Sequence, residues 1–294
     1  MSARIMVQGA SSGCGKSTVV ALLCRHFASK GYKVAPFKAT NLSLNSYVTG
    51  EGLEIGISQA FQAWAAGIEP EVCMNPVLLK PGGDAGIQLV FEGRPLMDLK
   101  RGSQVPLDLL LKATKRAYQS LAERFDIVVI EGAGSPVELN LTERDIANMR
   151  TAAIADAPVI LVGDIEVGGV FAGLFGTYTL MSKEDRKRVK GYLVNRFRGE
   201  ENILIPGFVM LSARMAVPSL GVLPMLDVRL PSEDALSLGT TKTSAGGGGD
   251  AREEWTRNLD SLLFEARKHL DLARIEDIAF GRDSAGIATI QRNE

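Results

Sequence analysis

A glycine-rich turn near the N-terminus constrains this chain more than any other feature. Residues 4–8 are apolar and typical of a buried strand, and residues 16–30 have the spacing of a helix. The turn between them, GASSGCG, leads directly into Lys16, Ser17 and Thr18. In a strand, glycine turn and helix of this order, backbone N–H groups and the helix N-terminus converge on phosphate oxygens. The pattern predicts a site for ATP or GTP.

The spacing of this turn indicates which residues bind the nucleotide. The pattern A/G-x4-G-K-S/T is met from Ala10, whereas counting from Gly9 gives a loop one residue longer than usual. Lys16 is expected to neutralise the terminal phosphates, and the Ser17 hydroxyl to bind Mg²⁺. A purely structural turn is the alternative. The predicted nucleotide-binding residues of the loop are Gly9, Ser12, Gly13, Cys14, Gly15, Lys16, Ser17 and Thr18.

Short apolar runs alternate with helical patterns along most of the chain. Such alternation is typical of a mostly parallel sheet with helices on both faces. We therefore predict an α/β fold, a doubly wound sheet of the P-loop NTPase type, with ligands at the carboxyl ends of its strands. The predicted strands are 4–8, 32–36, the start of 125–134, 158–165 and 189–197, and the predicted helices are 16–30, 54–66, 107–124 and 145–155.

The character of the chain changes after the segment LPSEDALSLG. Residues 1–239 are predicted to form one catalytic domain, and the polar, glycine-rich residues 240–254 a flexible linker. Residues 255–294 form a predicted C-terminal helical tail. Its part 255–279 is amphipathic, which predicts a helix or a helix pair used for packing or for a homodimer.

Charge and composition exclude several classes of function. The formal net charge of -1 gives no electrostatic reason to expect nucleic acid or an anionic membrane as a partner. No apolar run reaches the roughly 20 residues needed to cross a bilayer, and Met1 leads into the first strand without a signal peptide. The three cysteines form no CxxC pair, which argues against a zinc site. A cytoplasmic location is expected.

Two acidic residues follow buried strands and could complete a metal site. Glu131 ends the run DIVVIE and precedes a glycine loop, so its carboxylate is expected to face the nucleotide and bind Mg²⁺ with Ser17. Asp164 ends PVILVGD and is a second candidate. An aspartate at that place can instead cap the following helix, and a glutamate can be an ordinary loop residue.

The segment after the second predicted strand is unusually rich in polar side chains. Composition indicates a loop, a helix and a second loop between residues 34 and 84, and a connection of this length suggests a binding segment. Lys38, Asn41 and Asn45 follow the strand closely. They could point into the phosphate cleft, although a lone lysine there is often simply solvated.

These segments together resemble the cobyric acid synthase family of glutamine-dependent amidotransferases. The resemblance covers about residues 4–239, and it implies a synthetase domain built like dethiobiotin synthetase, whose longer loop spacing agrees with GASSGCGKS. The matching segments are FKATNLSLNSYVT, EIGISQAFQAWAAGIEP, MNPVLLKPGGD, EGAGSPVELNL, RDIANM, APVILVGDIEVGGVFAGLFGT, VKGYLVNRFRG, GVLP and LPSEDALSLG.

The resemblance implies a reaction in which ATP phosphorylates a corrinoid carboxylate and ammonia then displaces the phosphate to give an amide. It implies that Lys16 and Ser17 hold the phosphates and Mg²⁺, that Lys38 bridges the γ-phosphate and the carboxylate, and that Glu131 and Glu54 complete the metal site. Glu54 could instead be a charge favoured by a helix dipole.

The resemblance also suggests residues that bind the substrate and the base. Asn195, which ends GYLVN, lies where this group places a base-recognising asparagine, although it could be a strand-end cap. The expected corrinoid-binding residues are Asn41, Asn45, Asn75, Lys80 and Asp84.

The chain departs from the family pattern where a glutaminase would begin. A glutaminase needs a nucleophilic cysteine in a G-x-C-x-G turn and a histidine base, but every cysteine precedes residue 74 and the only histidines are His26 and His269. The final helical segment faintly resembles the C-terminus of the full-length family, which suggests an internal loss of the glutaminase. Ammonia is therefore expected to be free or to come from a separate glutaminase subunit.

Two other functions stay open from the sequence. A degenerate paralogue would bind nucleotide without turnover. A related ligase of the dethiobiotin synthetase type would act on a different carboxylate, and the loosened segment GGDAGIQ leaves room for such a change of substrate.

Overall fold

A computed structural model describes residues 2–81, 86–100, 105–141, 143–225 and 248–282. A parallel sheet forms its centre, with the order β12-β11-β10-β1-β9-β2. Its strands are β1 (Ala3–Gly9), β2 (Val34–Phe37), β9 (Ile127–Glu131), β10 (Val159–Asp164), β11 (Val189–Phe197) and β12 (Ser219–Pro224). The predicted doubly wound α/β fold is thus confirmed.

Helices cover both faces of this sheet because its strands are apolar on both sides. Ile5 and Val7 of β1 pack into one hydrophobic cluster, whereas Met6, between them, packs into the other. The helices are α1 (Lys16–Ser29), α2 (Ile57–Ala65), α3 (Leu107–Arg124), α4 (Met149–Ala155), α5 (Val170–Leu180), α6 (Lys183–Arg188), α7 (Ile205–Met215), α8 (Gly248–His269) and α9 (Leu272–Ala279), with short 3₁₀ turns at Val72–Met74 and Glu201–Leu204.

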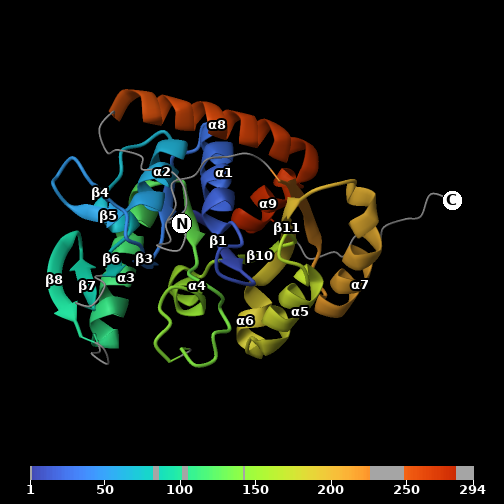
Figure 1. Ribbon diagram of the computed structural model, residues 1–294, viewed down its shortest axis with the longest axis horizontal. Coiled ribbons are helices and arrows are strands. Elements are labelled where there is room, and N and C mark those ends of the chain that lie inside the picture. The colour runs from blue at the N-terminus through green and yellow to red at the C-terminus, as the bar shows by residue number, and fades with distance from the viewer. Residues whose placement is uncertain (1, 82–85, 101–104, 142, 226–247, 283–294) are drawn as a thin grey trace.

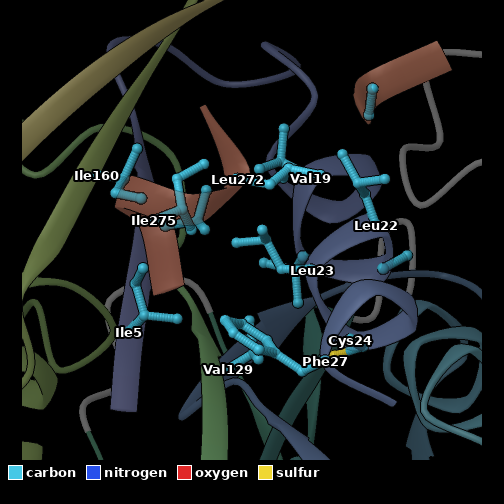
Figure 2. Packing of buried hydrophobic residues seen from close by; sticks show 14 of the residues in the cluster. Ile5, Val19, Leu22, Leu23, Cys24, Phe27, Val129, Ile160, Leu272 and Ile275 are labelled. Carbon is cyan, nitrogen blue, oxygen red and sulfur yellow. The ribbon is translucent and has the colours of Figure 1, made fainter. Parts of the chain in front are cut away.

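The C-terminal helix pair packs against the phosphate-loop helix. In Figure 1, α8 runs along one side of the molecule across α1 and α2. Figure 2 shows Leu272 and Ile275 of α9 filling the space between Ile5 of the central strand and Leu23 of α1. The predicted amphipathic helix pair therefore buries its apolar face within this chain.

The polar segment between β2 and α3 folds differently from the predicted loop, helix and loop. A second sheet with the order β3-β6-β7-β8 and a separate antiparallel pair β4-β5 form there. Only β3 and β6 pair over a long stretch of chain, from Thr40 to Val77, whereas β4-β5, β6-β7 and β7-β8 are local antiparallel pairs whose short strands are masked in the sequence by their many polar residues. They are β3 (Thr40–Leu42), β4 (Ser46–Val48), β5 (Glu54–Gly56), β6 (Val77–Pro81), β7 (Ile87–Phe91) and β8 (Arg94–Leu99).

Several predicted boundaries are wrong for local reasons. The helix predicted from residue 54 begins at Ile57, since Gly56 is extended and donates its N–H to Asn75 Oδ1. The helix predicted from residue 145 begins at Met149, because the Asp145 carboxylate accepts two backbone N–H groups and forms a turn instead.

Two further boundaries also need correction. The second strand is displaced to Val34–Phe37 from the predicted 32–36. The predicted linker 240–254 is wrong for residues 248–254, which begin α8, and its remainder lies outside the described residues. Among the described helices, none is both long and apolar enough to cross a membrane.

Candidate functional site

Glycine conformation shapes the loop between β1 and α1. Gly13 and Gly15 have φ values of 69° and 96°, in the left-handed region that favours glycine. A Cβ atom added to Gly15 would lie 2.0 Å from Nδ2 of Asn195, and one added to Gly9 would lie 2.4 Å from Sγ of Cys14. The loop therefore has no room for side chains at Gly9 and Gly15.

Lys16 is folded back over this loop. Its side chain is largely buried, and Nζ donates to the carbonyl oxygens of Ser11 at 3.1 Å and Gly134 at 2.9 Å. Gly134 belongs to the loop that follows β9. The ammonium is thus held between two loops at the carboxyl ends of parallel strands, where an anionic ligand is expected in such folds.

Three predicted site residues from different elements meet at the carboxylate of Glu131. Oε1 of Glu131 accepts hydrogen bonds from Ser17 Oγ and from Lys38 Nζ, each at 2.8 Å. Ser17 is in the first turn of α1, Glu131 ends β9, and Lys38 directly follows β2. Hydroxyl and carboxylate oxygens are the donors that Mg²⁺ prefers, and it commonly takes one or two protein ligands beside phosphate oxygens. Ser17 and Glu131 fit that role.

The other oxygen of Glu131 is bound by a residue that the sequence analysis missed. Gln62 on α2 donates to Oε2 of Glu131, and it is almost completely buried. One signal for it was present in the sequence, because Gln59 and Gln62 stand three residues apart in an otherwise apolar helix.

A cavity of about 1130 Å³ extends from the phosphate loop over these residues. Its polar wall includes Ser12, Lys16, Ser17, Lys38, Asn41 and Glu131, all predicted site residues. Its apolar wall includes Phe61, Leu79, Leu89, Leu107, Leu110 and Trp255. The cavity thus joins a phosphate-binding end to an apolar region large enough for a second, bulky ligand.

Trp255 brings the C-terminal helix α8 into this cavity wall. Its indole Nε1 donates to the backbone carbonyl of Phe61 at 3.1 Å, and the two rings meet edge to face at 5.0 Å. From the sequence, this tryptophan is expected in a helical tail beyond the domain formed by residues 1–239. Only the packing of α8 on α2 shows that it borders the site.

Glu54 lies outside the residues that line this cavity, in an ion pair with Lys80 and a hydrogen bond with Ser46. Burial acts to raise the pKa of the Glu54 carboxyl, but the hydrogen bonds from Lys80 and Ser46 outweigh burial and hold that pKa below its usual value. Metal binding by Glu54 stays a prediction, and it would require Lys80 to release the carboxylate.

Three other predicted substrate residues are placed as follows. Asn75 is buried and binds the backbone of Gly56, Lys38 and Val77, so it fixes the start of β6 beside Lys38. Asn45 is exposed, and its backbone carbonyl accepts from Ser43. Asp84 lies outside the described residues.

Both polar side-chain atoms of Asn195 form hydrogen bonds with backbone groups. Nδ2 donates to the carbonyl of Cys14 at 2.9 Å, and Oδ1 accepts from the N–H of Arg196. Asn195 thereby locks the phosphate loop to β11. Its neighbour Arg196 has a left-handed φ of 64°, lines the cavity and forms an ion pair with Asp164 at 2.6 Å. The Asp164 carboxylate is thus occupied by Arg196 rather than facing the cavity.

The chain is similar in sequence to known cobyric acid synthases. A cobyric acid synthase from Clostridium acetobutylicum is 48% identical over 244 residues, which is 82% of this chain and 50% of that protein. One from Clostridium botulinum is 49% identical over 244 residues, covering 83% of this chain and 50% of that protein. This chain therefore spans about half the length of the curated relatives that it matches.

A solved structure, the MinD cell division protein of Aquifex aeolicus, aligns with 97% of this chain and 99% of its own at 13% identity and a TM-score of 0.49. The family model of the CobQ/CobB/MinD/ParA nucleotide binding domain matches residues 5–236 of this chain. This range includes all the described strands, apart from the first two residues of β1. The chain belongs to the CobQ/CobB/MinD/ParA nucleotide binding domain family.

Proposed function

We propose that this chain is an ATP-dependent amide ligase that acts on peripheral carboxylates of a corrinoid, converting adenosylcobyrinic acid a,c-diamide to cobyric acid. The observation that carries this proposal is the meeting of Ser17, Lys38 and Glu131 beside the phosphate loop, at the end of a large, partly apolar cavity. The identity of nearly one half to cobyric acid synthases supports the choice of substrate.

The proposed reaction has two steps. A carboxylate oxygen of the substrate attacks the γ-phosphorus of ATP, the bond to the bridging oxygen breaks, and ADP leaves. Ammonia then attacks the carbonyl carbon of the acyl phosphate, loses a proton, and expels inorganic phosphate to leave the amide. The protein lowers both barriers mainly by orienting the reactants and by stabilising negative charge.

Each side chain at the phosphate end has a role in this proposal. Lys16 exchanges its carbonyl partners for the terminal phosphates of ATP. Ser17 and Glu131 would hold Mg²⁺, which neutralises phosphate charge. Lys38, already beside Glu131, balances the charge of the phosphate and of the substrate carboxylate as they approach one another. Asn41, Asn45, Lys80 and Asp84 are proposed for the corrinoid side. The predicted substrate contact of Asn75 is not proposed again, because its buried side chain binds the backbone of Gly56, Lys38 and Val77 instead.

The ammonia is proposed to come from solution or from a glutaminase outside this sequence. A glutaminase nucleophile needs a thiol with a lowered pKa. Here burial raises the pKa of the Cys24 thiol, and burial together with Glu71 raises that of Cys73 to about 12. Cys14 is buried within the phosphate loop.

The test is to incubate the purified chain with ATP, Mg²⁺, ammonium and cobyrinic acid a,c-diamide, and to measure product mass and phosphate release. We expect the mass change of hydroxyl replaced by amino, with phosphate release that depends on both substrates. Lys16→Ala should abolish both. A protein that binds nucleotide tightly but forms no product, whether ammonium or a glutaminase is added, would instead be a non-catalytic paralogue. Phosphate release with a different carboxylate would indicate another ligase.

A further inference from the structure

Gln62 joins the two residues proposed to bind the metal. Its side-chain nitrogen donates to Oε2 of Glu131 and also lies 3.4 Å from the backbone carbonyl of Ser17. An amide nitrogen carries two hydrogens, so both are directed at these two partners. Gln62 on α2 thus connects the first turn of α1 to the end of β9.

The two oxygens of Glu131 are divided between different donors. Oε1 faces Ser17 and Lys38, whereas Oε2 faces Gln62. Glu131 is 1% exposed, and a buried carboxylate oxygen without a donor is costly, so this division fixes the orientation of the carboxylate. The amide of Gln62 thereby holds the carboxylate with one oxygen toward Ser17 and Lys38 and the other toward α2.

Gln62 is itself held by a chain of buried amides. Its Oε1 accepts from Nε2 of Gln59 at 3.5 Å, and Oε1 of Gln59 accepts from Nδ2 of Asn41 at 3.0 Å. A Cβ atom on Gly56 would lie 2.3 Å from Nδ2 of Asn41, so the glycine makes room for this chain. All three amide residues are almost fully buried, and Asn41 also lines the cavity.

We infer that Gln62 is a positioning residue that aims the Glu131 carboxylate at the metal site, and that Gln59 and Asn41 hold Gln62 in this orientation. This inference rests on the proposed Mg²⁺- and ATP-dependent reaction. Gln62 acts through Glu131, in the way that outer partners of a ligating carboxylate orient it toward the metal.

The decisive variant is Gln62→Met, which keeps the length of the side chain but removes the amide. Because loss of such an outer partner weakens metal binding about 10- to 100-fold, we expect the half-saturating Mg²⁺ concentration for ATP turnover to rise at least about tenfold. ADP binding measured in EDTA is expected to change by less than about twofold, since Lys16 and the loop are untouched. A general loss of structure would instead weaken both the Mg²⁺-dependent turnover and the metal-free binding of ADP.

Two further variants complete the test. Gln59→Met removes the donor to Gln62 and the acceptor of Asn41 but leaves the bond from Gln62 to Glu131 in place, so the rise in half-saturating Mg²⁺ is expected to be smaller, about threefold. Trp64→Phe changes the same helix away from Glu131 and should leave the Mg²⁺ dependence unchanged. If Gln62→Met does not fold, the Gln59→Met titration decides.

The outcomes separate the two proposals. An unchanged Mg²⁺ dependence in Gln62→Met, or in Gln59→Met where that variant decides, together with active wild-type protein, would overturn the role of Gln62. Equal weakening of Mg²⁺-dependent turnover and of metal-free ADP binding would also overturn it. Wild-type protein that shows no Mg²⁺-dependent turnover with the corrinoid would overturn the proposed function itself.

Discussion

The ammonium of Lys38 lies 2.8 Å from Oε1 of Glu131, and their side chains are only 4% and 1% exposed. Lys38 directly follows β2 and Glu131 ends β9, and the pairing of these two strands brings Phe37 opposite Ile130. Their ion pair is thus set by the parallel register of the central sheet. It also places the ammonium of Lys38 at the same oxygen that Ser17 contacts.

Replacing Lys38 by Met is expected to destabilise the protein by about 3–5 kcal/mol, because it leaves the buried Glu131 carboxylate without its counter-charge. Unfolding in urea measures this loss. The double variant Lys38→Met/Glu131→Gln should recover much of the stability but no activity. Additive losses in this double-mutant cycle would show that the pair does not interact in the folded protein.

Gly15→Ala and Gly13→Ala form a matched pair within the phosphate loop. Gly13 has open space around its missing side chain, so its substitution adds only the strain of a left-handed residue, roughly 1–2 kcal/mol. Gly15→Ala adds a clash with Asn195 and is expected to abolish nucleotide binding. Fluorescent ATP analogues measure the affinity. Equal affinities for the two variants would contradict the locking of the loop by Asn195.

Trp255→Ala tests the contribution of the C-terminal helix to the site. Removing this buried ring is expected to destabilise the protein by about 3–5 kcal/mol and to raise the KM for the bulky substrate, since it opens the cavity wall. Phe264→Ala is the control on the same helix, because Phe264 is 60% exposed and its loss should stay within about 0.5 kcal/mol. Thermal unfolding and steady-state kinetics provide the measurements, and equal effects of both variants would refute the proposed role of α8.

His26, buried in α1 near α9, is expected to make stability depend on pH. Burial, with the nearby charges of Lys30 and Arg267, lowers its pKa from 6.5 to about 4, against an opposing effect of Glu276. A lowered pKa in the folded state means that the unfolded chain takes up the proton first as pH falls. The His26 contribution to stability is therefore complete above pH 7 and lost between about pH 6.5 and pH 4, up to about 3 kcal/mol.

His26→Leu is the variant that isolates this effect from the carboxylates that also titrate at low pH. The free energy of unfolding of the wild-type protein minus that of the variant should fall as the pH is lowered from about 6.5 to about 4, and it should become constant at lower pH. A difference that does not vary with pH would mean that His26 keeps its ordinary pKa in the folded protein.

The phosphate loop and the alternation of strands and helices could be read from the sequence because their signals are local. The loop needs glycines at fixed spacing before Lys16, and the period of apolar residues distinguishes buried strands from helices. For the same reason Glu131 and Lys38 could be nominated from their positions after strands. Their meeting could be expected from the shared edge of a parallel sheet.

Other features depended on contacts between distant segments. The pairing of β3 with β6, the Glu54–Lys80 pair and the Trp255–Phe61 contact each join residues that lie between 26 and 194 positions apart in the chain. The direction of a polar side chain depends on which donors surround it after folding, so sequence spacing could not show that Gln62 faces Glu131 or that Asn195 turns toward the loop backbone.

Local signals in the sequence are enough to identify the phosphate loop, the parallel sheet that carries it and the residues at the ends of its central strands, because backbone sterics and apolar periodicity act over a few residues. The folded arrangement is needed to learn which of those polar groups share a partner and that the C-terminal helix forms part of the cavity. A buried polar group must find its partner wherever the folded chain places one, and that place is not encoded in local spacing.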